Sequence, residues 1–185
     1  MGFAHDAMKA VGQALHEVHA GAEKLAWHKV TGAGTKSMLV TSPEFTGGAR
    51  LPISCTADGS GLPPAIEWAN LPLGAQSLVV IAEDPDAPFP EPYVHWMVYG
   101  IPGSALSLDV RSRAAFMEGL NSKLAPGYAP ASPPPAHGVH HYHFQVFALD
   151  KMLDLEQGIG RRGLLDEMQG HVLAWGEIVG VYERT

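Results

Sequence analysis

Cysteine is almost absent from this sequence, in which Cys55 is the only one among 185 residues. A single cysteine cannot form a disulfide within the chain, so we expect a fold without disulfide bridges in a reducing compartment. Long apolar runs are also lacking, because none approaches the roughly 18 residues that cross a membrane. The first residues lack the basic and apolar stretches of a secretory signal. These absences predict a cytoplasmic protein without integral membrane association.

Positive charge is scarce as well, because 12 lysines and arginines face 19 acidic residues and the net charge is −7 with the histidines neutral. Nucleic acids bind basic surfaces, so we expect no nucleic-acid partner. Hydrophobic residues make up 46% of the chain and charged residues 17%, which indicates a globular rather than a disordered protein. Ten histidines make the net charge sensitive to pH between about 5 and 8.

Glycine and proline are plentiful, with 21 and 15 residues, and so many turns favour a β-rich domain over a helical bundle. Five β-prone runs, separated by turn-rich segments, occupy residues 37–41, 77–83, 93–99, 140–149 and 171–182. Residues 159–169 predict one short helix before the last strand. The sequence therefore predicts a mainly β fold, an antiparallel Greek-key-like β-sandwich with a few short peripheral helices.

The N-terminal part has a different pattern, in which apolar residues recur every three or four positions at Met8, Val11, Leu15, Val18, Ala22 and Leu25. This spacing predicts one amphipathic helix. We therefore divide the chain into an N-terminal amphipathic helix extension over 1–30, a linker over 31–36 and one domain over 37–185. The apolar stripe must pack against protein. Because it is narrow, it favours a two-fold homodimer over a cover for the chain's own domain.

Two carboxylates, Asp84 and Asp86, follow the run 77–83 and alternate with Pro85 and Pro88 in the segment DPDAP. Aspartate and proline are typical of turns, and a turn is one interpretation of this segment. The prolines also hold both carboxylates in a fixed pose. The pair could therefore orient a histidine, accept a hydrogen bond from a ligand ammonium group or bind a metal.

Histidines form the second group of candidates. Side chains alternate between the faces of a strand, so His140 and Tyr142 share one face and could enter a pocket. His141 and His143 share the other face, where, together with His137, they could bind a transition metal or form a solvated polar face, the interpretation we favour. His95 lies in the apolar run 93–99, as either a satisfied core residue or a functional one.

Motifs of covalent catalysis are missing, since the sequence has neither a G-x-S-x-G elbow nor a Cys-x-x-Cys pair. Three classes of function remain. The first is a non-enzymatic binding protein without a cofactor. The second is a metal-binding protein or metal-dependent enzyme built on the His137–His143 tract with the two aspartates. The third is an interaction protein that acts through the N-terminal helix or the prolines at 133–135.

Several motifs occur in a fixed order along the chain. They are TADGSGLPPAIEW (56–68), SLVVIAEDPDAP (77–88), HWMV (95–98) with IP (101–102), GLN (119–121) followed by Tyr128 and PPP (133–135), GVHHY (138–142) with FALD (147–150), and the closing segment 170–184. Together they resemble the phosphatidylethanolamine-binding protein family, specifically its bacterial branch, the Raf kinase inhibitor-like proteins. The resemblance spans about residues 37–184 and leaves out the N-terminal helix.

The resemblance implies a β-sandwich with a small preformed anion pocket that binds a phosphorylated or zwitterionic, head-group-like ligand, with a protein partner as a further expectation. Carried over residue by residue, the pocket would be lined by Asp84, Asp86, Pro88, His95, His140 and Tyr142. The sequence departs from the family pattern twice. His141 stands where the family has an arginine, and APASPPP (129–135) replaces the family's G-P-x-P-P loop. The first change removes a fixed positive charge.

Overall fold

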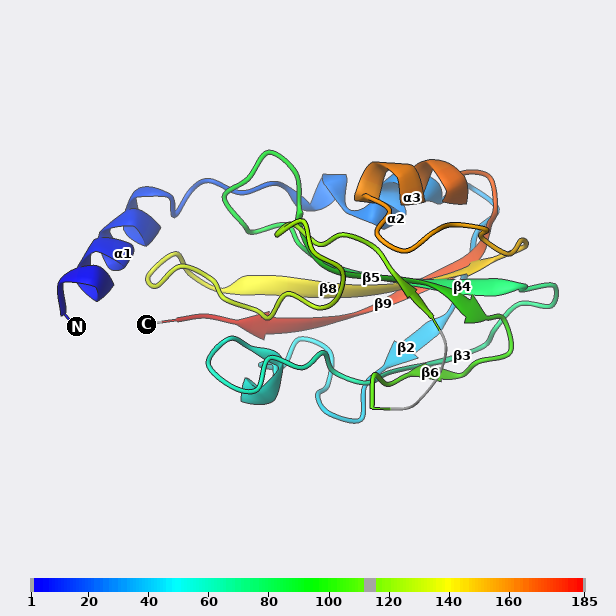
Figure 1. Ribbon diagram of the computed structural model, residues 1–185, viewed down its shortest axis with the longest axis horizontal. Helices are drawn as coiled ribbons and strands as arrows, with labels where there is room; N and C mark the ends of the chain where they lie inside the picture. Colours follow the sequence, from blue (N-terminus) through cyan, green and yellow to red (C-terminus); the bar gives the residue numbers. More distant parts are fainter. Residues whose placement is uncertain (1, 112–115, 185) are drawn as a thin grey trace.

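The computed structural model describes residues 2–111 and 116–184, which form two β-sheets and a few short helices (Figure 1). The larger sheet has the strand order β1-β9-β8-β4-β5-β7, and the smaller sheet has the order β2-β3-β6. The predicted mainly β fold is therefore confirmed.

The bounds of the elements are as follows. The larger sheet contains β1 (Lys36–Ser37), β9 (Val172–Tyr182), β8 (His140–Leu149), β4 (Ser77–Asp84), β5 (Tyr93–Pro102) and β7 (Met117–Glu118). The smaller sheet contains β2 (Leu39–Thr41), β3 (Ile66–Ala69) and β6 (Ser107–Leu108). The helices are α1 (Gly2–Ala14), α2 (Ala26–Val30) and α3 (Arg161–Met168), with 3-10 turns η1 (Ala22–Lys24) and η2 (Ile53–Cys55).

The expectation of purely antiparallel strands is wrong at one edge, where β1 runs parallel to β9. The chain reaches this edge from α2 rather than through a hairpin, so it enters in the same direction as β9. The predicted strand over 37–41 is also divided. At Met38, whose backbone N–H donates to the carbonyl of Trp175 at 2.8 Å, the chain leaves the larger sheet and continues as β2 in the smaller one.

Two apolar cores lie on the two faces of the larger sheet. Alternate residues of β4 divide between them, so that Val80 faces the smaller sheet whereas Val79 and Ile81 face α2 and α3. Figure 1 shows this layering, with α2 and α3 on one side of the larger sheet and β2, β3 and β6 on the other. Because β4 is buried along its whole length, the residues at its end are held rigidly.

A buried carboxylate fastens the helical layer to β4. The Glu83 side chain accepts hydrogen bonds from the backbone N–H of Ala26 and the amide of Gln145, both at 2.8 Å, and from the Arg161 guanidinium. A buried charge is tolerated when it is paired and hydrogen-bonded, as it is here. Glu83 therefore holds α2 and α3 against the sheet, although it stands next to the DPDAP segment in the sequence.

The single helix expected over 1–30 is wrong, because α1 ends at Ala14 and the chain then runs across the loop that follows β4. There the backbone N–H groups of Ala20 and Gly21 donate to loop carbonyls at 3.1 Å, and Gly21 adopts a φ of 99°, outside the helical region. These long-range hydrogen bonds replace the helical ones.

The first part of the apolar stripe does not cover the chain's own domain, since Met8 and Val11 are 51% and 54% exposed, whereas its last member, Leu25, is buried in that domain. What brings α1 close to the body is Gly12. A Cβ at that position would lie 2.0 Å from the carbonyl oxygen of Pro135, so only glycine permits the approach. None of the helices in residues 2–111 and 116–184 is long and apolar enough to cross a membrane.

Candidate functional site

A cavity of about 280 Å³ opens where β4 ends and where β5 and β8 begin. Its lining consists of Asp84, Ala87, Pro88, Phe89, Tyr93, His95, Lys123, Pro130, Ser132, Pro133, Pro134, His140 and Tyr142. Five of the six residues predicted for the pocket are therefore brought together, from strands far apart in the sequence.

Asp84 connects the two histidines of the cavity. One of its carboxylate oxygens accepts a hydrogen bond from the backbone N–H of Asp86 at 2.8 Å, which fixes the turn after β4. The other oxygen lies 2.7 Å from Nδ1 of His140, within a hydrogen bond, and 4.0 Å from Nε2 of His95. This buried carboxylate therefore orients His140 and lies beside His95.

His95 is buried, and its Nδ1 hydrogen bond to the carbonyl oxygen of Ala129 is 2.6 Å long. Because a carbonyl only accepts, Nδ1 carries the proton, and Nε2 is the nitrogen that faces Asp84. Burial lowers the pKa of His95, against the opposing influence of Asp84. The imidazole is therefore neutral at neutral pH.

Tyr142 supplies a polar atom without a partner. Its side chain is 1% exposed, and its hydroxyl is a buried group that makes no hydrogen bond to any residue the structure describes. Its ring packs edge-on against His95, with 5.1 Å between the ring centroids. Burial raises the pKa of Tyr142, so the hydroxyl keeps its proton. One residue of the cavity wall thus has a hydroxyl donor without an acceptor among the described residues.

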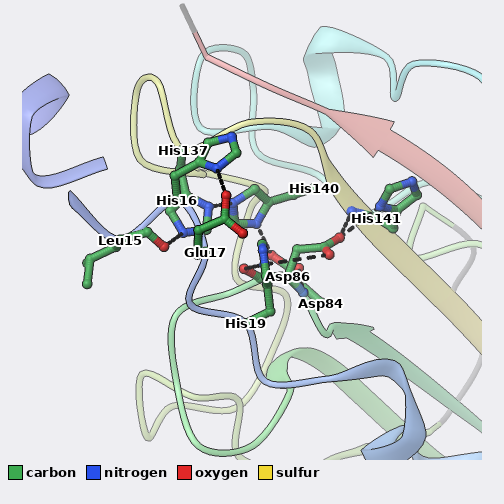
Figure 2. A network of polar contacts seen from close by, with 9 residues as sticks. All are labelled: Leu15, His16, Glu17, His19, Asp84, Asp86, His137, His140 and His141. Carbon is green, nitrogen blue, oxygen red and sulfur yellow. Dashed lines mark hydrogen bonds and ion pairs between the residues drawn. The ribbon is translucent and has the colours of Figure 1, made fainter. Parts of the chain in front are cut away.

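Asp86, the sixth predicted residue, lies outside the cavity lining. Its carboxylate accepts hydrogen bonds from the backbone N–H of His141 at 2.7 Å and from Nδ1 of the same residue at 2.8 Å (Figure 2). His141, the residue in the place of the family arginine, thus pairs with Asp86 outside the cavity lining. The alternation along β8 explains this, since His141 and His140 face opposite ways.

The His137–His143 tract is occupied by separate pairs rather than a common centre. Nδ1 of His143 lies 2.9 Å from Glu177, His141 binds Asp86, and Nδ1 of His137 lies 2.8 Å from Nε2 of His140. Across residues 2–111 and 116–184, no three side chains of the metal-binding types stand where they could hold one ion. The geometry gives the metal hypothesis no support.

Several lining residues are not among those predicted from the sequence. The pattern of β5 could have indicated Tyr93, because Tyr93 and His95 are two positions apart on one strand and so share a face. Phe89 follows the DPDAP segment without a pattern of its own, and the segment 129–135 resembles a family loop without indicating which of its prolines line the cavity. Lys123 is an exposed loop residue that belongs to none of the motifs, and only the tertiary fold brings it to the cavity.

A family model for phosphatidylethanolamine-binding proteins matches residues 41–183. The chain belongs to the phosphatidylethanolamine-binding protein family. A UPF0098 protein of Chlamydia trachomatis is 36% identical over 152 residues, which cover 80% of this chain and 99% of that protein. A UPF0098 protein of Pyrococcus horikoshii is 36% identical over 162 residues, covering 84% of this chain and 81% of its own.

Solved structures of the phosphatidylethanolamine-binding protein family agree with this assignment. A homologue from Chlamydia trachomatis has a TM-score of 0.75 and 34% identity, covering 82% of this chain and 100% of its own. YbcL of E. coli also has a TM-score of 0.75, with 27% identity over 80% of this chain and 99% of its own. The residues that line the cavity lie within the family match, whereas residues 1–40 lie outside it.

Proposed function

We propose that this member of the phosphatidylethanolamine-binding protein family is a non-enzymatic binding protein whose cavity takes a phosphorylated or zwitterionic, head-group-like ligand. The observation that carries the proposal is the Tyr142 hydroxyl, buried in the cavity wall and without a partner among the described residues. Buried hydroxyls are nearly always hydrogen-bonded, so an unpaired donor in a cavity suggests a ligand acceptor atom. A phosphate or carboxylate oxygen suits it best.

The charges around the cavity favour a ligand with both signs. Lys123 is the only lysine or arginine among the described residues that line it, and it can attract an anionic group. Asp84 would repel a bare polyanion but can accept a hydrogen bond from an ammonium group. An anion beside His95 also favours the protonated imidazole, which then becomes a second donor. A phosphomonoester that carries an amine satisfies all three groups.

The remaining walls limit the size of the ligand. Pro88, Phe89, Tyr93 and the prolines at 130, 133 and 134 give the cavity apolar surfaces that suit the carbon atoms of a short ester. The cavity volume of about 280 Å³ lies near the lower end of small-molecule sites, which are typically about 300–1,000 Å³. We therefore infer a head group or a molecule of similar size as the occupant.

Binding is favoured over acid–base catalysis at His140. Nδ1 of this histidine is hydrogen-bonded to Asp84, and Nε2 is hydrogen-bonded to His137. A general base needs a free nitrogen within hydrogen-bonding distance of the proton that it removes. With both nitrogens engaged, His140 is better suited to shaping the cavity than to exchanging protons with a substrate.

Calorimetric titration tests the proposal, with phosphoethanolamine, inorganic phosphate, ethanolamine and zinc as separate titrants. We expect phosphoethanolamine to bind one-to-one and more tightly than phosphate or ethanolamine. If neither phosphate nor phosphoethanolamine produces heat of binding at millimolar concentration, the proposal fails. Stoichiometric zinc binding in place of phosphoethanolamine binding would favour the metal-dependent alternative.

A further inference from the structure

The segment 15–21, which we call the strap, links α1 to η1 and crosses two loops that border the cavity. At one end, the backbone N–H groups of Ala20 and Gly21 donate to the carbonyls of Ala87 and Pro85 at 3.1 Å. At the other end, the carbonyl of Leu15 lies 2.8 Å from Nε2 of His137. The strap lies outside the family match, which begins at residue 41.

An unbroken chain of hydrogen bonds runs from the strap to the cavity (Figure 2). It begins at the Leu15 carbonyl and Nε2 of His137, passes from Nδ1 of His137 to Nε2 of His140 at 2.8 Å, and ends between Nδ1 of His140 and Asp84 at 2.7 Å. Asp84, His137 and His140 are each 3% exposed or less. Water therefore has little access to these contacts.

This hydrogen-bonded chain, from the Leu15 carbonyl through His137 and His140 to Asp84, requires a fixed number of protons. Each of its three contacts requires one proton, because a lone pair must face an N–H or O–H group. An ionised Asp84 carries none, and neutral His140 and His137 carry one each. The chain closes only with one further proton, held between Asp84 and His140. When these groups carry two protons in total, two lone pairs face each other at one of the contacts. When they carry four protons, two hydrogen-bond donors face each other at one of the contacts.

We propose that docking of the strap on the two loops that border the cavity is pH-gated, so that the strap stays docked only while the hydrogen-bonded chain Asp84–His140–His137 carries three protons. The Leu15 carbonyl fixes the proton of His137 on Nε2, so the docked strap leaves Nδ1 as an acceptor for His140. When the third proton leaves, one contact becomes repulsive, and the contact to the strap is the one that can open without disturbing the sheet. Docking of the strap and the protonation of His140 in the cavity wall are therefore linked.

Other titratable groups face this chain and shape its response. From the strap, the rings of His16 and His19 lie 6.5 and 5.6 Å from the ring of His137, centroid to centroid. His16 also pairs with Glu17, and His19 lies 3.2 Å from the backbone carbonyl of Asp86, in the loop after β4.

From β5, His95 faces Asp84, and Lys123 lies near His95. From β8, the Tyr142 hydroxyl keeps its proton and carries no charge. Burial, followed by the neighbouring histidines, lowers the pKa of His137. The neutral form of His137 is therefore favoured near neutral pH, which disfavours a fourth proton in the hydrogen-bonded chain.

Amide hydrogen exchange measured by NMR spectroscopy on the full chain without ligand tests this proposal. The amides of Ala20 and Gly21 report docking, and those of β8 report global unfolding. After correction for intrinsic exchange rates, we expect strap protection to be highest near about pH 6 and about tenfold lower near about pH 8, equivalent to ~1.4 kcal/mol.

Three variants test which residue causes the pH dependence of strap protection. His137→Gln keeps an amide that can donate to Leu15 but cannot titrate, so its strap protection should not vary between about pH 6 and 8. His171→Gln is a matched control, because His171 pairs with Asp150 at the opposite end of β8 and β9, and it should keep the native profile. A flat native profile, or a pH dependence retained in His137→Gln, overturns the proposal. Loss of the pH dependence in His19→Gln but not in His137→Gln also overturns it.

Discussion

Replacing Tyr142 with phenylalanine should change ligand affinity and stability in opposite directions. The hydroxyl is buried, and none of the described residues accepts its hydrogen bond. Burying a hydroxyl without a partner costs about 1–3 kcal/mol. Removing it should therefore leave the unliganded protein as stable as the native one or up to about 1 kcal/mol more stable. A gain of that size raises the Tm by about 2–4 °C in a chain of this length.

The same change removes the donor that we assign to the ligand. Hydrogen bonds to charged groups contribute about 1.5–3 kcal/mol, so the affinity of Tyr142→Phe for phosphoethanolamine should fall by roughly 10- to 150-fold. Calorimetry measures the affinity and thermal unfolding measures the stability. A purely structural tyrosine would show a loss of stability with unchanged affinity, and that result would refute the reasoning.

Tyr99→Phe is the matched control. The Tyr99 hydroxyl is satisfied, since it donates to the backbone carbonyl of Glu156, and the ring belongs to the core between the larger sheet and the helices. Removing this hydroxyl should cost about 1 kcal/mol of stability and leave phosphoethanolamine affinity unchanged. Each variant lacks one hydroxyl oxygen of the native protein. Opposite effects on stability and affinity would therefore isolate the role of the Tyr142 hydroxyl.

Five further predictions concern the pH dependence, the anchors of the helices and the oligomeric state. Because burial lowers the pKa of His95 and a bound anion opposes that shift, ligand binding should take up a proton, and calorimetry should show affinity rising as the pH falls from about 8 to about 6. In the unliganded protein, the lowered pKa of His95 makes the unfolding free energy depend on pH in the opposite direction from ligand affinity. The unfolded chain binds the proton first, so the unfolding free energy should fall as the pH drops below about 6.5. Gly12→Ala should displace α1, because its Cβ would lie 2.0 Å from the Pro135 carbonyl oxygen, and limited proteolysis should then cut the N-terminal segment faster without a change in the urea midpoint of the domain. Glu83→Ala removes the buried partner of the Arg161 guanidinium and should cost about 3 kcal/mol in urea unfolding, whereas unchanged stability would argue against this anchor. The homodimer stays a prediction. If the exposed stripe of α1 forms it, light scattering should show a dimer for the native chain and a monomer for Val11→Asp.

The long strands and most of the site could be predicted from the sequence because their determinants are local. β8 is ten residues long, and its alternation places His140 and Tyr142 on one face and His141 on the other, as the structure has them. The apolar run of β4 predicts a buried strand, and the aspartate at its end is therefore fixed in place. Short strands such as β6, with two residues, offer no pattern of this kind.

The remaining features depend on contacts between distant segments. Leu15 and Leu25 fit one helical stripe, yet the backbone between them bonds to the loop after β4, and no periodicity reports such bonds. The sequence of the DPDAP segment does not indicate which of Asp84 and Asp86 lines the cavity. The Asp86 carboxylate is instead bound by His141, which lies on the distant strand β8. Which ring nitrogen of a histidine lacks a hydrogen-bond partner likewise depends on residues that only the folded structure brings close.

The crystal structure of the native protein soaked with phosphoethanolamine tests the central claim most directly. We expect a phosphate oxygen within about 2.5–3.0 Å of the Tyr142 hydroxyl, the range of O–H···O hydrogen bonds, with the amine directed toward Asp84. Density for the ligand elsewhere on the molecule, or a Tyr142 hydroxyl still without a partner at saturating ligand, would contradict the account.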